Sequence, residues 1–225
     1  MIIVTGGTSG LGKAITKNLI LNGEKVITIS RSNFSNNENH IACDLTDFKS
    51  LKKAYKKINE RKDTLDSIIN CAGIASMNLA LTTPPEVTEQ IIKTNLIGTI
   101  FVNQVFSPLL IRNRRGRIIN FSTIAVNLAL KGESIYAASK AGVETFSRVL
   151  AKELSPFNIT VNCISPGPIR TNLLKGISDN KIKKITQQQI IQKEMNPSDL
   201  FKIIDFLLSE NSSNITGQVL NLGGF

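Results

Sequence analysis

Short apolar runs alternate with longer amphipathic segments along this chain of 225 residues. The short runs, rich in Ile and Val, predict strands over residues 2–5, 25–29, 40–42, 67–70, 117–121, 160–164 and 218–221. In the longer segments apolar residues recur every three or four positions, which predicts helices over residues 11–21, 48–60, 85–112, 135–154, 181–192 and 197–209. Such alternation is typical of a parallel sheet with helices on both faces. We therefore expect one α/β domain over residues 1–225, a doubly wound Rossmann-type fold with about seven strands.

The residues that bind metals or form disulfides are scarce. The chain has a single histidine, His40, and its three cysteines, Cys43, Cys71 and Cys163, lie far apart. We expect no metal site and no disulfide framework, and reduced thiols favour a cytoplasmic location. No run of 18 apolar residues occurs, so no membrane span is expected. The apolar start of the chain leads directly into glycines and is interpreted as the first strand rather than a signal peptide.

Basic residues outnumber acidic ones, 27 against 17, which gives a formal charge of +10. They gather mainly in residues 49–62, 112–117 and 181–184. In the first of these clusters Leu51, Ala54 and Ile58 recur at helical spacing, so the lysines are interpreted as the solvent face of an amphipathic helix. We expect no nucleic-acid partner. Attraction of an anionic substrate or cofactor is a milder use of the same charge.

A glycine-rich turn, T-G-G-T-S-G-L-G, joins the first predicted strand to the first helix. Glycines let backbone N–H groups approach a pyrophosphate, and a helix N-terminus adds a partial positive charge. An ordinary strand-to-helix turn is the alternative, but the position between strand and helix favours a phosphate site. The expected cofactor-binding residues are Gly6, Thr8, Ser9, Gly10, Leu11 and Gly12.

Further motifs follow in a fixed order along the chain. Residues 70–73 read N-C-A-G, residues 95–98 read N-L-I-G, residues 136–140 read Y-A-A-S-K, and residues 215–218 read I-T-G-Q. Together with the glycine turn, they resemble the short-chain dehydrogenase/reductase family over nearly the whole chain, most closely the 3-oxoacyl-acyl-carrier-protein reductase-like members. The resemblance implies further cofactor contacts at Asn70, Ala72, Gly73, Pro166, Gly167, Ile169 and Thr171.

The residues after the second predicted strand bear on the choice of cofactor. NAD requires a carboxylate there for the ribose 2′-hydroxyl, whereas this chain has Ser30, Arg31 and Ser32. A guanidinium pairs well with a 2′-phosphate, so we expect NADP(H) to be preferred over NAD(H). A surface arginine is the alternative. Asp44 and Leu45 resemble the family pair beside the adenine, with helix capping as an equal alternative for Asp44.

Tyr136 and Lys140 are four residues apart, so on a helix they project from one face. A neighbouring ammonium favours the phenolate, so we expect Lys140 to lower the pKa of Tyr136. Tyr136 could then exchange a proton with a carbonyl or alcohol oxygen. The resemblance also implies that Lys140 binds the nicotinamide ribose.

The family's catalytic serine falls at Thr123, thirteen residues before Tyr136. Threonine keeps the hydroxyl that can donate to the substrate oxygen, and we favour Thr123 over its neighbour Ser122. The resemblance adds Asn95 to the catalytic group, where it would support a water linked to Lys140. Its alternative role is a side chain bonded to backbone within a helix.

These observations predict an NADP(H)-dependent reductase that transfers hydride between nicotinamide and a ketone or secondary alcohol. The favoured substrate is a 3-oxoacyl thioester. A shortened region before Asn70 and a short lid leave sugar or polyol substrates as an alternative. A weakly catalytic NADP(H)-binding scaffold is a third possible function.

The polar residues 172–192 are the expected lid, whose lysines would either attract an anionic substrate or form a solvated surface. Family members usually form homotetramers, so a dimer or tetramer is expected.

Overall fold

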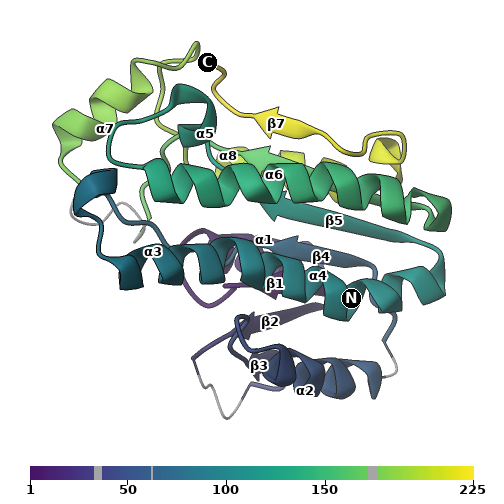
Figure 1. Cartoon of the computed structure of the whole chain (residues 1–225). Coiled ribbons are helices and arrows are strands. Elements are labelled where there is room, and N and C mark those ends of the chain that lie inside the picture. Colours follow the sequence, from purple (N-terminus) through teal and green to yellow (C-terminus); the bar gives the residue numbers. More distant parts are fainter. Residues whose placement is uncertain (33–36, 62, 172–176) are drawn as a thin grey trace.

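The computed structural model contains one sheet of seven parallel strands in the order β3-β2-β1-β4-β5-β6-β7 (Figure 1). The structure describes residues 1–32, 37–61, 63–171 and 177–225. The strands are β1 (Ile2–Thr5), β2 (Val26–Ser30), β3 (His40–Ala42), β4 (Ser67–Asn70), β5 (Gly116–Phe121), β6 (Ile159–Ser165) and β7 (Val219–Asn221). This topology confirms the doubly wound α/β fold predicted from the strand–helix alternation.

The longer helices follow the amphipathic segments closely. They are α1 (Gly10–Leu21), α2 (Phe48–Asn59), α3 (Pro85–Ile92), α4 (Gly98–Asn113), α6 (Ser134–Leu154), α7 (Asp179–Thr186) and α8 (Ser198–Leu208). The expected helix over residues 181–192 ends early, because the chain turns after Thr186 and Ile191 N–H donates to the Gly223 carbonyl at 2.8 Å. The short helix α5 (Ala125–Leu128) has too few residues to show a periodic pattern.

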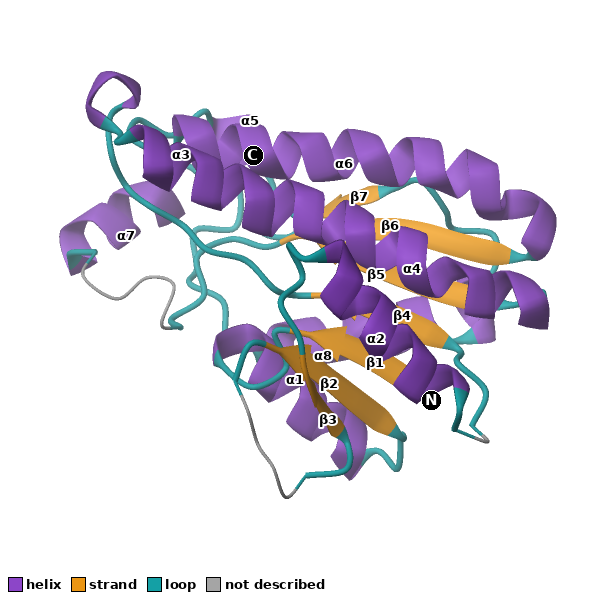
Figure 2. Ribbon diagram, turned by 60° about the horizontal axis from the view of Figure 1, so that its bottom comes forward, coloured by secondary structure: helices purple, strands orange, loops and turns teal. Residues whose placement is uncertain are grey.

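Helices cover both faces of the sheet (Figure 2), and each face has its own apolar core. Successive strand side chains point to opposite faces, so Ile3 packs with α2, α4 and α6, whereas Ile2 and Val4 pack with α1 and α8. Phe106 on α4 and Leu200 on α8 are fully buried in the two cores. Burial on both faces explains why the strands read as continuous Ile and Val runs rather than as alternating patterns.

A π-helical segment, Lys93–Ile97, joins α3 to α4 into one continuous helix. Among the described residues, this helix, Pro85–Asn113, is the one long and apolar enough to cross a membrane by length and composition. It packs instead against α2 and α6 on the sheet, and 56% of its most apolar window is buried. We therefore interpret it as a core helix of the domain. The wider turn of the π segment carries Asn95, which is fully buried.

Candidate active site

A cavity of about 910 Å³ lies at the carboxyl ends of the central strands. The strand order reverses between β1 and β4, and the loops that follow these strands diverge to opposite faces of the sheet. The cavity is lined by the loops after β1, β2, β4, β5 and β6, by the start of α6 and by α7. Among the described residues, all the predicted cofactor-binding and catalytic residues line it except Asn70 and Asn95.

The glycine turn forms one end of this cavity. A Cβ atom at Gly12 would lie 2.4 Å from the Gly6 carbonyl oxygen, so the first turn of α1 can approach the end of β1 only without a side chain there. Ser9 precedes α1, its side chain makes no capping hydrogen bond, and the first turn contains no acidic residue. The N–H groups that begin α1 therefore face the cavity without a competing anion, which suits a phosphate.

The residues after β2 and β3 form the adjoining wall. Ser30 accepts a hydrogen bond from Thr8 at 3.0 Å, which ties this wall to the glycine turn. Arg31 is exposed beside Ser30 and lines the cavity. Asp44 accepts from the Thr46 N–H at 2.8 Å, whereas the N-cap of α2 is Asp47. Asp44 is therefore part of the capping cluster, residues 44–47, that begins α2, and it also lines the cavity, so both of its interpretations stay open.

Asn70 has a different position from the one expected. It lies at the end of β4, almost fully buried, and its Nδ2 donates to Asn120 Oδ1 on β5 at 2.8 Å. The cavity is lined instead by the residues that follow, Cys71, Ala72 and Gly73. Asn70 therefore contributes to the end of the sheet and does not line the cavity, and its contact with the cofactor stays a prediction.

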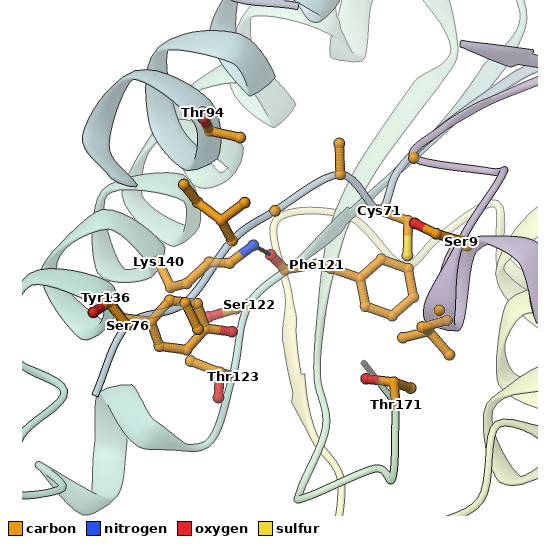
Figure 3. A pocket seen from close by; sticks show the side chains of 18 of the residues that line it. Ser9, Cys71, Ser76, Thr94, Phe121, Ser122, Thr123, Tyr136, Lys140 and Thr171 are labelled. Carbon is orange, nitrogen blue, oxygen red and sulfur yellow. Dashed lines mark hydrogen bonds between the residues drawn. The ribbon is translucent and has the colours of Figure 1, made fainter. Parts of the chain in front are cut away.

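Tyr136 and Lys140 project from one face of α6 into the cavity (Figure 3). Burial raises the pKa of Tyr136, the nearby Glu133 carboxylate raises it further, and a side-chain hydrogen bond with Thr123 lowers it. Burial also lowers the pKa of Lys140 to about 8, and its Nζ donates to the Phe121 carbonyl at 2.8 Å. The expectation that Lys140 lowers the pKa of Tyr136 is therefore wrong for this structure, because burial dominates both groups.

The two candidate hydroxyls after β5 have different partners. Ser122 donates to Glu144 Oε1 on α6 at 2.6 Å. Glu144 is buried, and its Oε2 forms an ion pair with Arg148 Nη2 at 3.5 Å. Thr123 is hydrogen-bonded to Tyr136 and accepts from the Ala125 N–H at 3.3 Å. This arrangement favours Thr123 over Ser122 as the hydroxyl at the reacting oxygen.

One face of α6 is joined to the end of β5 at successive turns. Besides the contacts of Tyr136, Lys140 and Glu144, Asn120 Nδ2 donates to Ser147 Oγ at 2.7 Å. We call this row of contacts the α6–β5 ladder. Because all four contacts are polar and three are buried, they fix the rotation and the height of α6 relative to the sheet.

Asn95 connects three segments behind the cavity. Its Oδ1 accepts from the Ile74 N–H at 2.8 Å, and its Nδ2 donates to the Ile74 carbonyl at 2.9 Å and to Ser139 Oγ at 3.0 Å. A Cβ atom on Gly73 would lie 3.3 Å from Asn95 Oδ1 and 3.4 Å from Lys140 Nζ. Asn95 thus bonds to the backbone of another segment rather than of its own helix, and it lies next to the lysine.

A family model described as enoyl-(acyl carrier protein) reductase matches residues 6–224. The chain belongs to the short-chain dehydrogenase/reductase family. Among the relatives of known name, it is 32% identical to the 3-oxoacyl-[acyl-carrier-protein] reductase MabA of Mycobacterium tuberculosis, covering 99% of this chain and 91% of that protein. It is 30% identical to the 3-oxoacyl-[acyl-carrier-protein] reductase FabG of Escherichia coli, covering 99% and 95%.

Solved structures agree with this family assignment. The aldohexose dehydrogenase AldT of Thermoplasma acidophilum matches with a TM-score of 0.89 and 28% identity, covering 99% of this chain and 92% of that one. ElxO with NADP bound matches with a TM-score of 0.88 and 28% identity, covering 98% and 96%. The family motifs supply the glycine turn, residues 71–73, and Tyr136 and Lys140 to the cavity lining.

The family motifs do not point to two acidic residues near the reaction centre. Glu133 directly precedes α6 and lines the cavity, and Glu144 anchors Ser122. Glu144 follows Lys140 by four residues, so helical spacing places it on the same face, but only the fold shows that this face is buried.

On α7, Ile182 and Ile185 line the cavity while Lys181, Lys183 and Lys184 are exposed. The solvated-surface interpretation of these three lysines is therefore favoured, and Lys175 lies outside the described residues.

Proposed function

We propose that this oxidoreductase is an NADP(H)-dependent carbonyl reductase in which Tyr136 exchanges the proton. The observation that carries the proposal is the group formed by Tyr136, Thr123 and Lys140 at the wall of the cavity that also contains the glycine turn. Figure 3 shows these three side chains together, with Ser9 and Thr171 on the other side of the cavity. A cofactor in this cavity would place its pyrophosphate at the glycine turn and its nicotinamide near Tyr136.

The residues present fit a nicotinamide dinucleotide. Gly6 and Gly12 leave no room for a Cβ against Ala72 and the Gly6 carbonyl, so the turn stays tight, and the uncapped start of α1 suits the pyrophosphate. Arg31 and Ser30 would hold the 2′-phosphate of NADP(H), and Ile169 and Thr171 would border the nicotinamide. When bound, the cofactor supplies or accepts the hydride. The bound NADP of ElxO, similar over nearly the whole chain, supports this choice.

The protein side of the reaction is proton transfer and charge stabilisation. In the reducing direction Tyr136 donates its hydroxyl proton to the carbonyl oxygen, and Thr123 donates a hydrogen bond to the same oxygen. Lys140, with its pKa near 8, exchanges protons readily near neutral pH and lies against Gly73 and Asn95.

We propose a 3-oxoacyl thioester as the first substrate class to test. FabG and MabA, to which this chain is similar over nearly its whole length, are both named as 3-oxoacyl-[acyl-carrier-protein] reductases, and this supports the choice. The second candidate is a sugar or polyol, which the similarity to the AldT aldohexose dehydrogenase supports. An NADP(H)-binding scaffold without turnover is the third.

We also propose that the chain forms one domain and that several copies assemble into a homo-oligomer in the cytoplasm. Ala137, Ala138 and Ala141 line a groove of about 500 Å³ on the outer side of α6, together with Val126 and Ala129. Such small side chains allow another helix to approach closely.

The first experiment follows the loss of NADPH absorbance with acetoacetyl-coenzyme A, using Tyr136→Phe protein as the control. Turnover that disappears in the variant while NADPH binding persists supports the proposal. Equal turnover in both proteins would refute the role of Tyr136. NADPH binding without turnover of thioesters, sugars or polyols would favour the scaffold.

A further inference from the structure

Glu133 is a buried carboxyl group on the substrate side of the reaction centre. Its side chain is 9% exposed and lines the cavity. Its backbone carbonyl accepts from the Ala137 N–H at 2.7 Å, which fixes Glu133 at the start of α6, three residues before Tyr136. Residues at this spacing lie side by side on a helix, so the carboxyl group adjoins the reacting tyrosine.

The charges around Glu133 are few. Burial raises the pKa of Glu133, Lys181 of α7 lowers it, and the Glu133 charge in turn raises the pKa of Tyr136. Lys181 is itself exposed, so water screens much of its effect. Glu86, Glu89 and Lys93 line the cavity from exposed positions, and Glu89 forms an ion pair with Lys93 Nζ at 3.5 Å, so water and this pairing weaken their effect. The neighbouring lining residues of α7, Ile182 and Ile185, are apolar.

We propose that Glu133 is a specificity-determining residue that selects a carbonyl substrate with a hydroxyl group next to the reacting carbon and rejects one with a carboxylate there. The proposal rests on the carbonyl reductase function proposed above, and it follows the sugar or polyol candidate, because a 3-oxoacyl thioester has no hydroxyl group next to its reacting carbon. A carboxylate accepts a hydrogen bond from a hydroxyl, and in a largely buried site it repels a second carboxylate strongly. The apolar residues beside it would hold the rest of the substrate.

Two aromatic ketones that differ at this one substituent test the proposal. 2-Hydroxyacetophenone carries a hydroxymethyl group beside its carbonyl, whereas phenylglyoxylate carries a carboxylate, and the phenyl ring suits Ile182 and Ile185. The preference is the ratio of kcat/KM for the hydroxyketone to kcat/KM for the oxo acid, measured at pH 8. Glu133→Gln keeps the shape and removes the charge, and Glu153→Gln, an exposed carboxyl on the same helix, is the control.

We expect the wild-type protein to prefer the hydroxyketone and Glu133→Gln to reduce this preference about tenfold or more. Glu153→Gln is expected to leave the preference unchanged, and Glu133→Asp, which keeps the charge, to retain it. A preference unchanged in Glu133→Gln, or lost equally in Glu133→Asp, would overturn the proposal.

A binding experiment separates failure of this proposal from failure of the proposed function. Affinities of both ketones are measured by calorimetry on Tyr136→Phe protein saturated with NADPH, with and without Glu133→Gln. A charge-dependent preference in binding supports the role of Glu133 even if no turnover occurs with either ketone. Equal affinities for both ketones, or no binding of either, would refute it whatever the turnover.

Discussion

The two neighbouring hydroxyls, Ser122 and Thr123, are expected to give opposite results when each is removed. Ser122→Ala deletes the donor to the buried Glu144 carboxylate, a hydrogen bond of 2.6 Å. A hydrogen bond to a charged group contributes about 1.5–3 kcal/mol, so the free energy of unfolding should fall by about 2 kcal/mol. In a domain of this size the corresponding fall in Tm is about 4–8 °C.

Thr123→Val keeps the shape of the side chain and removes the hydroxyl beside Tyr136. Loss of one donor to a developing oxyanion lowers kcat by about 10²- to 10³-fold. The stability effect is smaller, because the remaining bond to Thr123, from the Ala125 N–H, is long at 3.3 Å. Its loss should cost under about 1 kcal/mol.

Thermal unfolding and steady-state reduction of one ketone are measured on both variants, with the double variant as a check on additivity. Ser122→Ala should retain kcat within about threefold, since only its anchoring bond is lost. The reasoning is refuted if Ser122→Ala loses activity at full stability while Thr123→Val remains active. That result would assign the catalytic hydroxyl to Ser122.

Three further predictions concern the cofactor, the lysine and the glycine turn. Arg31→Ala should raise the KM for NADPH about tenfold or more and leave that for NADH nearly unchanged, and an equal effect on both would refute the 2′-phosphate contact. Lys140 has a pKa of about 8 against an ordinary 10.5, so its protonation opposes folding below pH 8 and this penalty is relieved as the pH rises to 10.5. In urea titrations, the free energy of unfolding of the wild-type protein should therefore rise by about 3 kcal/mol between pH 8 and pH 10.5 relative to that of Lys140→Met. If the free energies of the two proteins change in parallel with pH, the buried ammonium is contradicted. Gly12→Ala places a Cβ 2.4 Å from the Gly6 carbonyl oxygen. It should lower the free energy of unfolding by about 1–3 kcal/mol and abolish NADPH binding. Unchanged NADPH binding in a fluorescence titration would show that the turn can widen freely.

Local patterns were sufficient to predict most of the fold. Strands buried on both faces read as Ile and Val runs, and the glycine turn carries its own steric signature, so β1, α1 and their connection could be located from sequence. For most elements, the predicted ends lie within one or two residues of the observed ends. The exception is α7, where the bond from Ile191 to Gly223, 32 residues later, ends the amphipathic pattern early.

The electrostatics of the site depend on burial, which sequence spacing does not report. Tyr136 and Lys140 were correctly placed on one helical face, yet the direction of the Tyr136 pKa shift was wrong because both groups are desolvated. Asn70 belongs to a family motif, but its side chain faces Asn120 rather than the cavity. Sequence spacing relates Glu133 to Tyr136 and Glu144 to Lys140, but only the packing of α6 against β5 and α7 buries these carboxyl groups beside the reaction centre.

The π segment at Asn95 has a consequence for which sequence changes this family member can tolerate. A segment of this kind contains one residue more than a regular helix, so deleting a residue there would restore uniform α-helix. The helix on one side would then rotate by about 100° relative to the other. Ile91, before the segment, and Val102, after it, are both buried now and could not both remain so. A one-residue deletion in Lys93–Ile97 should therefore be far more damaging than any single substitution in the same segment except at Asn95.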